Sequence, residues 1–302
     1  MLWNRTLATV IVMTLLAGTP AEAKNWGNWS APVSIESLPG SSSLLNTPAV
    51  DGCPSLSPDG LALYFTSNRP GGLGGVDIWV AKRPSTAQGF GAPVNLGAPI
   101  NSPGNESCPT ITQGNLLFFS STRHDPAGDL YVTNRGPKGW GPVDRLGANI
   151  NSDGVIEEAV ALFEDEEGRE VIHFNSGGDI YYSVDYGPAQ LAAGGVNSSS
   201  IDKRPGISKD GLEIFWDSER YGTLGGSDFW TATRSSTSQP WGTAQHLPAL
   251  SAPGAGGFFG PGFDARAYLS RDGSTLIFGS VRDGGEGFVD LYISTRQKLI
   301  GN

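Results

Sequence analysis

Short runs of apolar residues alternate with turn residues along most of the chain. The clearest example spans residues 54–82, where an apolar-polar run ends in a Pro-Asp-Gly turn at 58–60, a strand-like run follows at 61–67, and a third run follows at 77–80 after a glycine-rich tip. Runs of this length, rich in aromatic and β-branched residues and bounded by Gly, Pro and Asp, predict strands joined by tight turns. We therefore predict three consecutive strands in this stretch.

The same pattern recurs four more times, in copies that begin at residues 109, 160, 205 and 267. Two columns of residues define the repeat. The first column is aromatic and consists of Phe65, Phe119, Phe174, Trp216 and Phe278. The second column is acidic and precedes the third strand of each copy: Asp77, Asp129, Asp179, Asp228 and Asp290. Such columns indicate one supersecondary unit that is repeated five times.

A fourth strand is predicted between the copies, where an aromatic residue precedes a segment of the Gly-Pro-Val type. These segments begin at Phe90, Trp140, Tyr186 and Trp241. A fifth such segment, beginning at Trp29, stands before the first copy, whereas none follows the last copy. The chain thus opens with one outer strand and closes with three inner strands, which predicts a ring sealed by its two ends.

The string SNRPGGLGGVDIWV at residues 67–80 resembles a repeat of the WD-repeat-like, TolB-type β-propeller family. It is most similar to the repeats of cell-envelope proteins that carry an OmpA-type domain, and the similarity covers about residues 26–296. The resemblance implies a β-propeller. Combined with the repeat count, it predicts an all-β fold, a five-bladed β-propeller of four-stranded antiparallel blades, closed by an N-terminal outer strand that joins the C-terminal blade.

The first 23 residues have the pattern of a cleaved secretory signal peptide. An apolar run at 7–16 follows Arg5, and Ala21-Glu-Ala23 matches a small-residue cleavage site. The run is too short for a membrane span, which needs about 20 apolar residues. We expect a signal peptide at 1–23, a propeller domain at 24–302, and a periplasmic or secreted protein that is monomeric and has no membrane span.

Composition narrows the class of partner. The formal net charge of −10 and the lack of a Lys/Arg cluster argue against nucleic acid, because a phosphate backbone would be repelled. The 43 glycines and 21 prolines fall at fixed repeat offsets, which is typical of turns in a folded domain rather than of disorder.

Each innermost strand is predicted to begin with a carboxylate. These residues are Asp51, Glu106, Glu157, Asp202 and Asp264. Five acids around a narrow axis repel one another, so they must be hydrogen-bonded, paired, partly protonated or bound to a cation such as Ca²⁺. We expect Arg204 and Arg266 to neutralise two of them. A structural role, in which the acids fasten loops, and a role in an axial binding site remain alternatives.

Cys53 and Cys108 occupy the same column of neighbouring copies. An exported protein favours disulfides, yet the bond requires Cα atoms within roughly 4.4 to 6.8 Å. A disulfide and two buried free thiols are both compatible with the sequence.

Two loop features complete the candidate site. Arg69, Arg123, Arg220 and Arg282 stand across a hairpin loop from the acidic column, so we predict a charged link between the two ends of that loop, with a set of arginines that face a ligand as the alternative. A long glycine-rich loop at 247–263 carries Phe258 and Phe259, which either pack on the ring or contact a ligand.

The function predicted from these features is that of an exported, non-catalytic binding module of the cell envelope. Its ligand would be an envelope protein or a glycan, bound by the five acids, the two arginines and the two phenylalanines. The alternative is a glycan-active hydrolase or lyase that draws a carboxyl pair from Asp51, Glu157 and Asp202, because glycosidic cleavage needs two carboxyl groups. No catalytic motif decides between them, so the sequence leaves the enzyme question open, and it predicts no cofactor beyond the candidate Ca²⁺.

Overall fold

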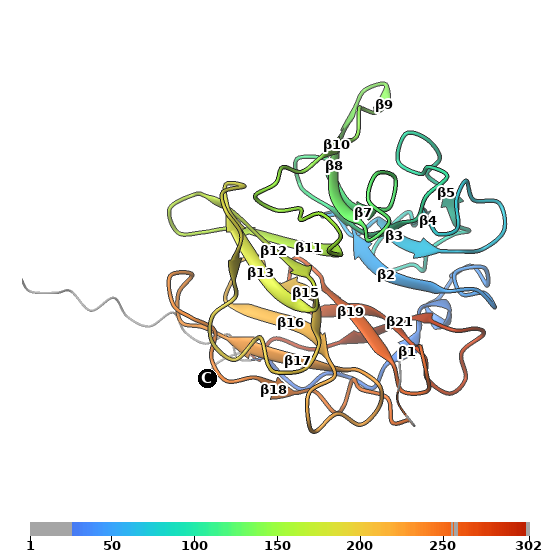
Figure 1. The fold of residues 1–302 in the computed structure, drawn as a ribbon. Coiled ribbons are helices and arrows are strands. Elements are labelled where there is room, and N and C mark those ends of the chain that lie inside the picture. The colour runs from blue at the N-terminus through green and yellow to red at the C-terminus, as the bar shows by residue number, and fades with distance from the viewer. Residues whose placement is uncertain (1–25, 255, 257–258, 300–302) are drawn as a thin grey trace, which may run out of the picture.

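The computed structural model describes residues 26–254, 256 and 259–299. The predicted signal peptide and Phe258 lie outside the described residues. Apart from the short 3₁₀ helix η1 (Ile35–Ser37), the regular structure consists of strands, which form five sheets arranged as blades around a common axis (Figure 1). The predicted five-bladed β-propeller is therefore confirmed.

The strands of each blade run from the axis outward in chain order. The first blade contains β2 (Asp51–Leu56), β3 (Ala62–Ser67), β4 (Asp77–Lys82) and β5 (Val94–Asn95). The second contains β6 (Glu106–Ile111), β7 (Leu116–Ser121), β8 (Asp129–Gly136) and β10 (Asp144–Arg145), with β9 (Gly139–Trp140) extending β8 as a hairpin. The third contains β11 (Glu157–Glu164), β12 (Glu170–Ser176), β13 (Asp179–Val184) and β14 (Gln190–Leu191). The fourth contains β15 (Asp202–Ile207), β16 (Glu213–Ser218), β17 (Asp228–Thr233) and β18 (Gln245–His246).

The fifth blade joins the two ends of the chain. Its three inner strands are β19 (Asp264–Leu269), β20 (Thr275–Ser280) and β21 (Asp290–Thr295), and its outer strand is β1 (Val33–Ser34). Val33 lies opposite Ile293 in the antiparallel pair of β1 and β21, so the blue start of the chain lies beside its red end (Figure 1). This pairing confirms the predicted closure of the ring.

The core lies between the faces of neighbouring blades. All five residues of the aromatic column have no exposed surface, and one core cluster combines Leu56 and Phe65 of the first blade with Ile277 and Leu291 of the fifth. Burying a large apolar side chain contributes roughly 1.5–3 kcal/mol. The strict aromatic column is thus explained by packing between blades.

Every innermost strand carries a β-bulge at the same place. The residues at the bulge have positive φ angles between 49° and 63°, although none is glycine: Cys53, Cys108, Ala159, Arg204 and Arg266. The register between first and second strands shifts at this point in all five blades. A bulge re-aims the side chains near it. It also accommodates Pro54, Pro109 and Pro205, which could not donate to a regular ladder.

None of the helices in the described part of the chain is long and apolar enough to cross a bilayer.

Candidate functional site

The five acids that begin the innermost strands are fully buried. Four of them form ion pairs with the arginine that follows the second strand of the same blade: Arg69 with Asp51 at 2.5 Å, Arg123 with Glu106 at 3.4 Å, Arg220 with Asp202 at 2.5 Å and Arg282 with Asp264 at 2.8 Å. Each also accepts hydrogen bonds from the loop that leads into its strand or from the second strand. The acids therefore fasten loops to strands, which is the structural role that the sequence left as one of two alternatives.

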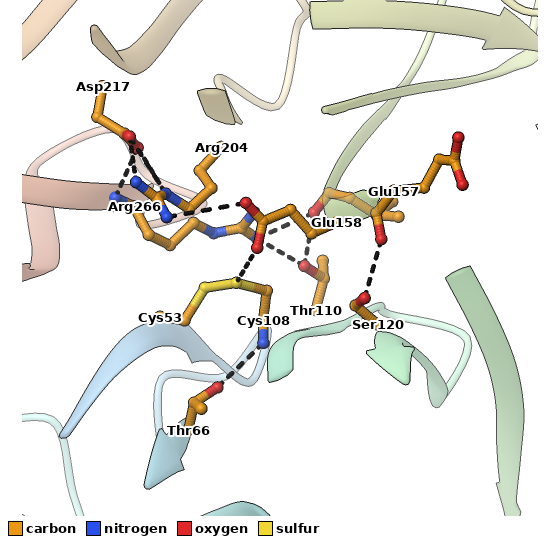
Figure 2. Close-up of a disulfide and its surroundings, with 11 residues drawn as sticks. Cys53, Thr66, Cys108, Thr110, Ser120, Glu157, Glu158, Arg204, Asp217 and Arg266 are labelled. Atoms are coloured by element: carbon orange, nitrogen blue, oxygen red, sulfur yellow. Dashed lines mark hydrogen bonds and ion pairs between the residues drawn. A yellow bond between two sulfur atoms is a disulfide. The ribbon is translucent and has the colours of Figure 1, made fainter. Parts of the chain in front are cut away.

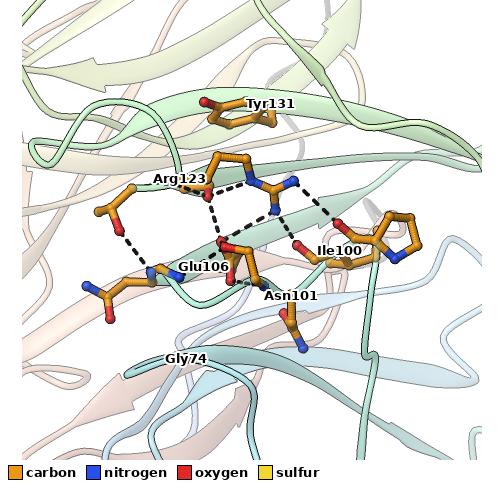
Figure 3. Close-up of polar contacts among 12 residues, drawn as sticks. Gly74, Ile100, Asn101, Glu106, Arg123 and Tyr131 are labelled. Atoms are coloured by element: carbon orange, nitrogen blue, oxygen red, sulfur yellow. Dashed lines mark hydrogen bonds and ion pairs between the residues drawn. The ribbon is translucent and has the colours of Figure 1, made fainter.

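Figure 3 shows one of these clamps in detail. The carboxylate of Glu106 accepts hydrogen bonds from the backbone N–H of Ser102 and from the hydroxyls of Ser102 and Ser121. Arg123 lies across it and also donates to the backbone carbonyls of Pro99 and Ile100. A carboxylate that accepts this many hydrogen bonds holds the surrounding loop and strands in place, so its role is structural.

The predicted link between these arginines and the acidic column is wrong. The acidic column binds the hairpin tip through backbone N–H groups instead, as where Leu73 and Leu224 donate to Asp77 and Asp228, each at 2.5 Å. The arginine is held toward the start of the first strand because its Nε donates to the serine at the end of the second strand, as in Arg69 and Ser67 at 2.9 Å. The acidic column thus holds the hairpin tip, whereas the arginines hold the start of the first strand.

Glu157 is the exception among the five acids, because Gly178 follows the second strand where the other blades have arginine. Its Oε1 accepts a hydrogen bond from the Ser176 hydroxyl at 2.9 Å, while its Oε2 is buried without a partner among the described residues. Burial raises the pKa of Glu157 to about 7. This carboxyl group is therefore neutral in a large fraction of molecules at neutral pH.

A disulfide and a charged cluster lie side by side among the innermost strands (Figure 2). Cys53 and Cys108 are bonded, with their Cα atoms 4.8 Å apart, which settles the alternative that the sequence left open. Beside the disulfide, the guanidinium of Arg204 donates to Asp217 at 2.6 Å and lies 3.7 Å from the carboxylate of Glu158. We call Glu158, Arg204 and Asp217 the axial cluster.

The expectation that Arg204 and Arg266 neutralise two of the strand-start acids is wrong. Arg204 pairs with Asp217 and Glu158 rather than with a strand-start acid. Burial opposes its charge, yet these two carboxylates leave the pKa of Arg204 raised. Arg266 donates its backbone N–H to Asp217 at 3.0 Å, and its Nη2 donates to the Thr110 hydroxyl at 2.7 Å and to the Val160 carbonyl at 3.0 Å.

Sequence reasoning missed Glu158 and Asp217. Figure 2 shows the carboxylates of Glu157 and Glu158 pointing in opposite directions, as successive residues of a strand do. Asp217 occupies a second-strand column in which the other blades have Thr66, Ser120, Asn175 and Gly279. Asp217 is the one acid in this column, and it stands in the same blade as Arg204. This coincidence is the sequence signal that could have identified the Arg204–Asp217 ion pair.

An aromatic pair borders the axial cluster. The ring of Phe263 lies 5.5 Å from the guanidinium carbon of Arg204 and packs edge-on against Phe259 with ring centroids 5.3 Å apart. Phe259 is 37% exposed, whereas Phe263 is buried. The structure thus brings one of the two predicted phenylalanines near the charged groups of the axis.

A cavity of about 770 Å³ opens at the other end of the axis, where the innermost strands end. We call it the funnel. Residues from all five blades line it, with Thr110, Val160 and Arg266 on its wall nearest the axial cluster. Lys209 and Arg271 line it on the fourth and fifth blades, while the third blade contributes Glu164, Glu170 and Asp185. Its size is that of a small-molecule site.

Among the described residues, no three or more His, Cys, Asp or Glu side chains are grouped so that they could hold a metal ion.

No protein-family model matches the sequence, and neither does any curated protein. Solved structures do match. The arabinanase of Bacillus subtilis superposes with a TM-score of 0.57 at 12% identity, covering 82% of this chain and 94% of the other. The catalytic domain of an α-L-arabinofuranosidase from Coprinopsis cinerea gives 0.57 at 15% identity, covering 89% and 97%. An exo-β-1,3-galactanase from Phanerochaete chrysosporium gives 0.53 at 14% identity, covering 89% and 66%.

These matches correct two predictions made from the sequence. The structures that resemble the chain are propellers of glycoside hydrolases, not TolB-type or WD-repeat propellers, and no family model supports the latter resemblance. The prediction of a non-catalytic binding module is replaced for the same reason, because the neighbours favour the glycan-active alternative. At these identities the likeness itself establishes the five-bladed architecture.

Proposed function

We propose that the protein is a glycan-active hydrolase whose reactive groups lie in the axial cluster. The observation that carries the proposal is the placement of two carboxylates, Glu158 and Asp217, on either side of Arg204 on the propeller axis. Hydrolysis of a glycosidic bond needs two such groups around the scissile bond. The propellers that match the chain come from enzymes named for arabinan, arabinofuranoside and galactan, which supports a neutral polysaccharide of this kind as substrate.

The two carboxylates differ in their surroundings, which suggests different roles. Asp217 accepts hydrogen bonds from the Arg204 side chain and from the backbone of Arg266, so its carboxyl group is held in place and is suited to stabilise positive charge on the sugar. Within the part of the chain that the structure describes, Glu158 forms one ion pair, the 3.7 Å contact with Arg204, and its side chain is 10% exposed. It is suited to exchange a proton with the leaving oxygen or with water. Phe259 offers an apolar face on which a sugar ring could stack.

The test is the release of reducing ends from arabinan and from β-1,3-galactan by the purified protein. We expect Glu158→Gln and Asp217→Asn each to lower the rate by about 100-fold or more, because each removes a group needed in the transition state. Asp153→Asn is the matched control, since Asp153 has a fully exposed side chain and does not belong to the axial cluster. Thermal melts must show that the variants are folded. Wild-type protein that releases no reducing ends, or a Glu158→Gln variant with full activity, would contradict the proposal.

We also propose that residues 1–23 are a signal peptide and that the mature protein, starting at Lys24, is secreted or periplasmic and acts as a monomer. The support is the pattern of charge, apolar run and small residues in the sequence. Intact mass measurement of the exported protein is expected to place its N-terminus at Lys24, and a retained N-terminal segment would contradict this.

A further inference from the structure

Arg266 is a buried cation with unused donors. Its side chain is 1% exposed, and only Nη2 has acceptors, namely Thr110 Oγ1 and the carbonyl oxygen of Val160. Nε and Nη1 are buried and have no hydrogen-bond partner among the described residues. Glu158 and Asp217 lie in the neighbouring axial cluster, yet neither accepts a hydrogen bond from Nε or Nη1. A guanidinium has five N–H donors, so most of its donor capacity is left over.

Arg266 is one of the residues that line the funnel, and its two unpartnered nitrogens are buried beneath the funnel surface. Leaving a charged group buried without partners is costly, whereas an anion placed beside it would satisfy the donors through charge-assisted hydrogen bonds. Lys209 and Arg271 add two exposed positive charges along the same wall of the cavity. The funnel is therefore equipped to hold a negative charge at its inner end.

The acidic residues of the funnel limit what the rest of the ligand can be. Glu164, Glu170 and Asp185 line the funnel on the third blade, and Glu164 lies directly opposite Glu170 in the β11–β12 pair. These carboxylates repel an ion of high negative charge but accept hydrogen bonds from hydroxyl groups. The cavity of about 770 Å³ is of the size that holds a small molecule.

We propose that the funnel is a binding site for a sugar acid, a ligand with a single carboxylate and several hydroxyls. The carboxylate binds Arg266, with Lys209 and Arg271 attracting it, and the hydroxyls donate to the acidic residues. This site lies at the end of the innermost strands and borders the axial cluster, because the backbone N–H of Arg266 donates to Asp217. Binding of a sugar acid requires no turnover, so the inference does not depend on the proposed hydrolysis. A uronic acid is the simplest ligand of this class.

Thermal unfolding of the full, disulfide-bonded protein tests the site with galacturonate as probe and galactose as the matched neutral sugar. We expect galacturonate to raise the melting temperature in a concentration-dependent way and galactose to have no effect, because only a ligand of the folded state stabilises it. Acetate and inorganic phosphate separate recognition of a sugar acid from recognition of any oxoanion. Both are expected to shift the melting temperature less than galacturonate does.

Three variants locate the site. Arg266→Met is expected to abolish the galacturonate shift, and it removes no ion pair, so the ring should fold. Lys209→Gln and Arg271→Gln change exposed side chains and are expected to weaken binding by about tenfold each, as for one lost charge-assisted contact. Lys138→Gln, an exposed lysine outside the funnel, is expected to leave binding unchanged.

No shift with galacturonate, or an equal shift with galactose, would overturn the proposal. An equal shift with phosphate or acetate would overturn the sugar-acid assignment. Arg271→Gln and Lys209→Gln variants that both bind like wild type would overturn the funnel as the location, even if Arg266→Met did not fold. Failure of the reducing-end assay would leave this inference standing, because the binding readout does not require turnover.

Discussion

At the residue scale, the five strand-start acids show how one missing partner changes the chemistry of a carboxyl group. Asp51 is paired with Arg69, whose side chain is itself only 8% exposed. Glu157 has the same position in its blade but no arginine, and burial raises its pKa from the ordinary 4.5 to about 7. The same column therefore holds four acids clamped by arginine and one that is not. Burial also raises the pKa of one clamped acid, Asp264, to about 6, but that of Glu157 rises further.

This contrast predicts opposite effects of two neutralising substitutions. The folded protein holds the Glu157 proton more tightly than the unfolded chain does, so the stability that this group contributes is complete below pH 4.5 and is lost as the pH rises through 7. Glu157→Gln keeps the neutral form at every pH. We expect it to match wild type at pH 4 and to exceed the wild-type free energy of unfolding by about 1–3 kcal/mol at pH 8.

Asp51→Asn is the matched comparison, because it leaves Arg69 buried without its ion-pair partner. We expect a loss of about 3 kcal/mol at pH 8, as is typical when one partner of a buried pair is removed. Urea denaturation of both variants at pH 4 and pH 8 measures these differences. A Glu157→Gln variant that is less stable than wild type at pH 8 would show that the carboxylate is paired in solution.

At the element scale, the sequence predicts the strands well and the direction of side chains poorly. Each innermost strand begins at the residue expected from the repeat columns, because turn residues and aromatic positions recur at fixed offsets. The face of each side chain depends on a period of two, so an error of one residue reverses it. That is why the prediction named Glu157, whose carboxylate points away from the axial cluster, while Glu158 forms part of it (Figure 2).

The bulge in each innermost strand is the second reason why the candidate site was only partly predictable. Positive φ at Arg204 and Arg266 re-aims these side chains, and only the following proline in some blades hints at this in the sequence. Arg204 therefore pairs with Asp217, thirteen positions later in the next strand, rather than with nearby Asp202. The repeat pattern predicts the packing between blades. It does not predict the contacts among the side chains of the axial cluster, because these depend on the bulge in each innermost strand.

At the scale of the whole molecule, two links hold neighbouring or terminal parts of the ring together. The pairing of β1 with β21 joins the two ends of the chain, and the disulfide of Cys53 and Cys108 joins the innermost strands of the first and second blades. The pairing is two residues long, and an isolated bridge between Trp26 and Lys298 adds to it. The disulfide is the covalent link, and we expect it to be a major part of what keeps adjacent blades together when the ring begins to open.

The double substitution Cys53→Ala and Cys108→Ala tests this. The bond closes a loop between residues 55 positions apart, so its loss is expected to lower the free energy of unfolding by up to about 4 kcal/mol, mainly by releasing the unfolded chain. Denaturant titration of the variant is compared with that of wild type in the presence and absence of a reductant. Reduced wild type should approach the variant, and the variant itself should not respond to the reductant. If the variant unfolds at the same denaturant concentration as oxidised wild type, the blades are held by packing alone and the disulfide does not stabilise the ring.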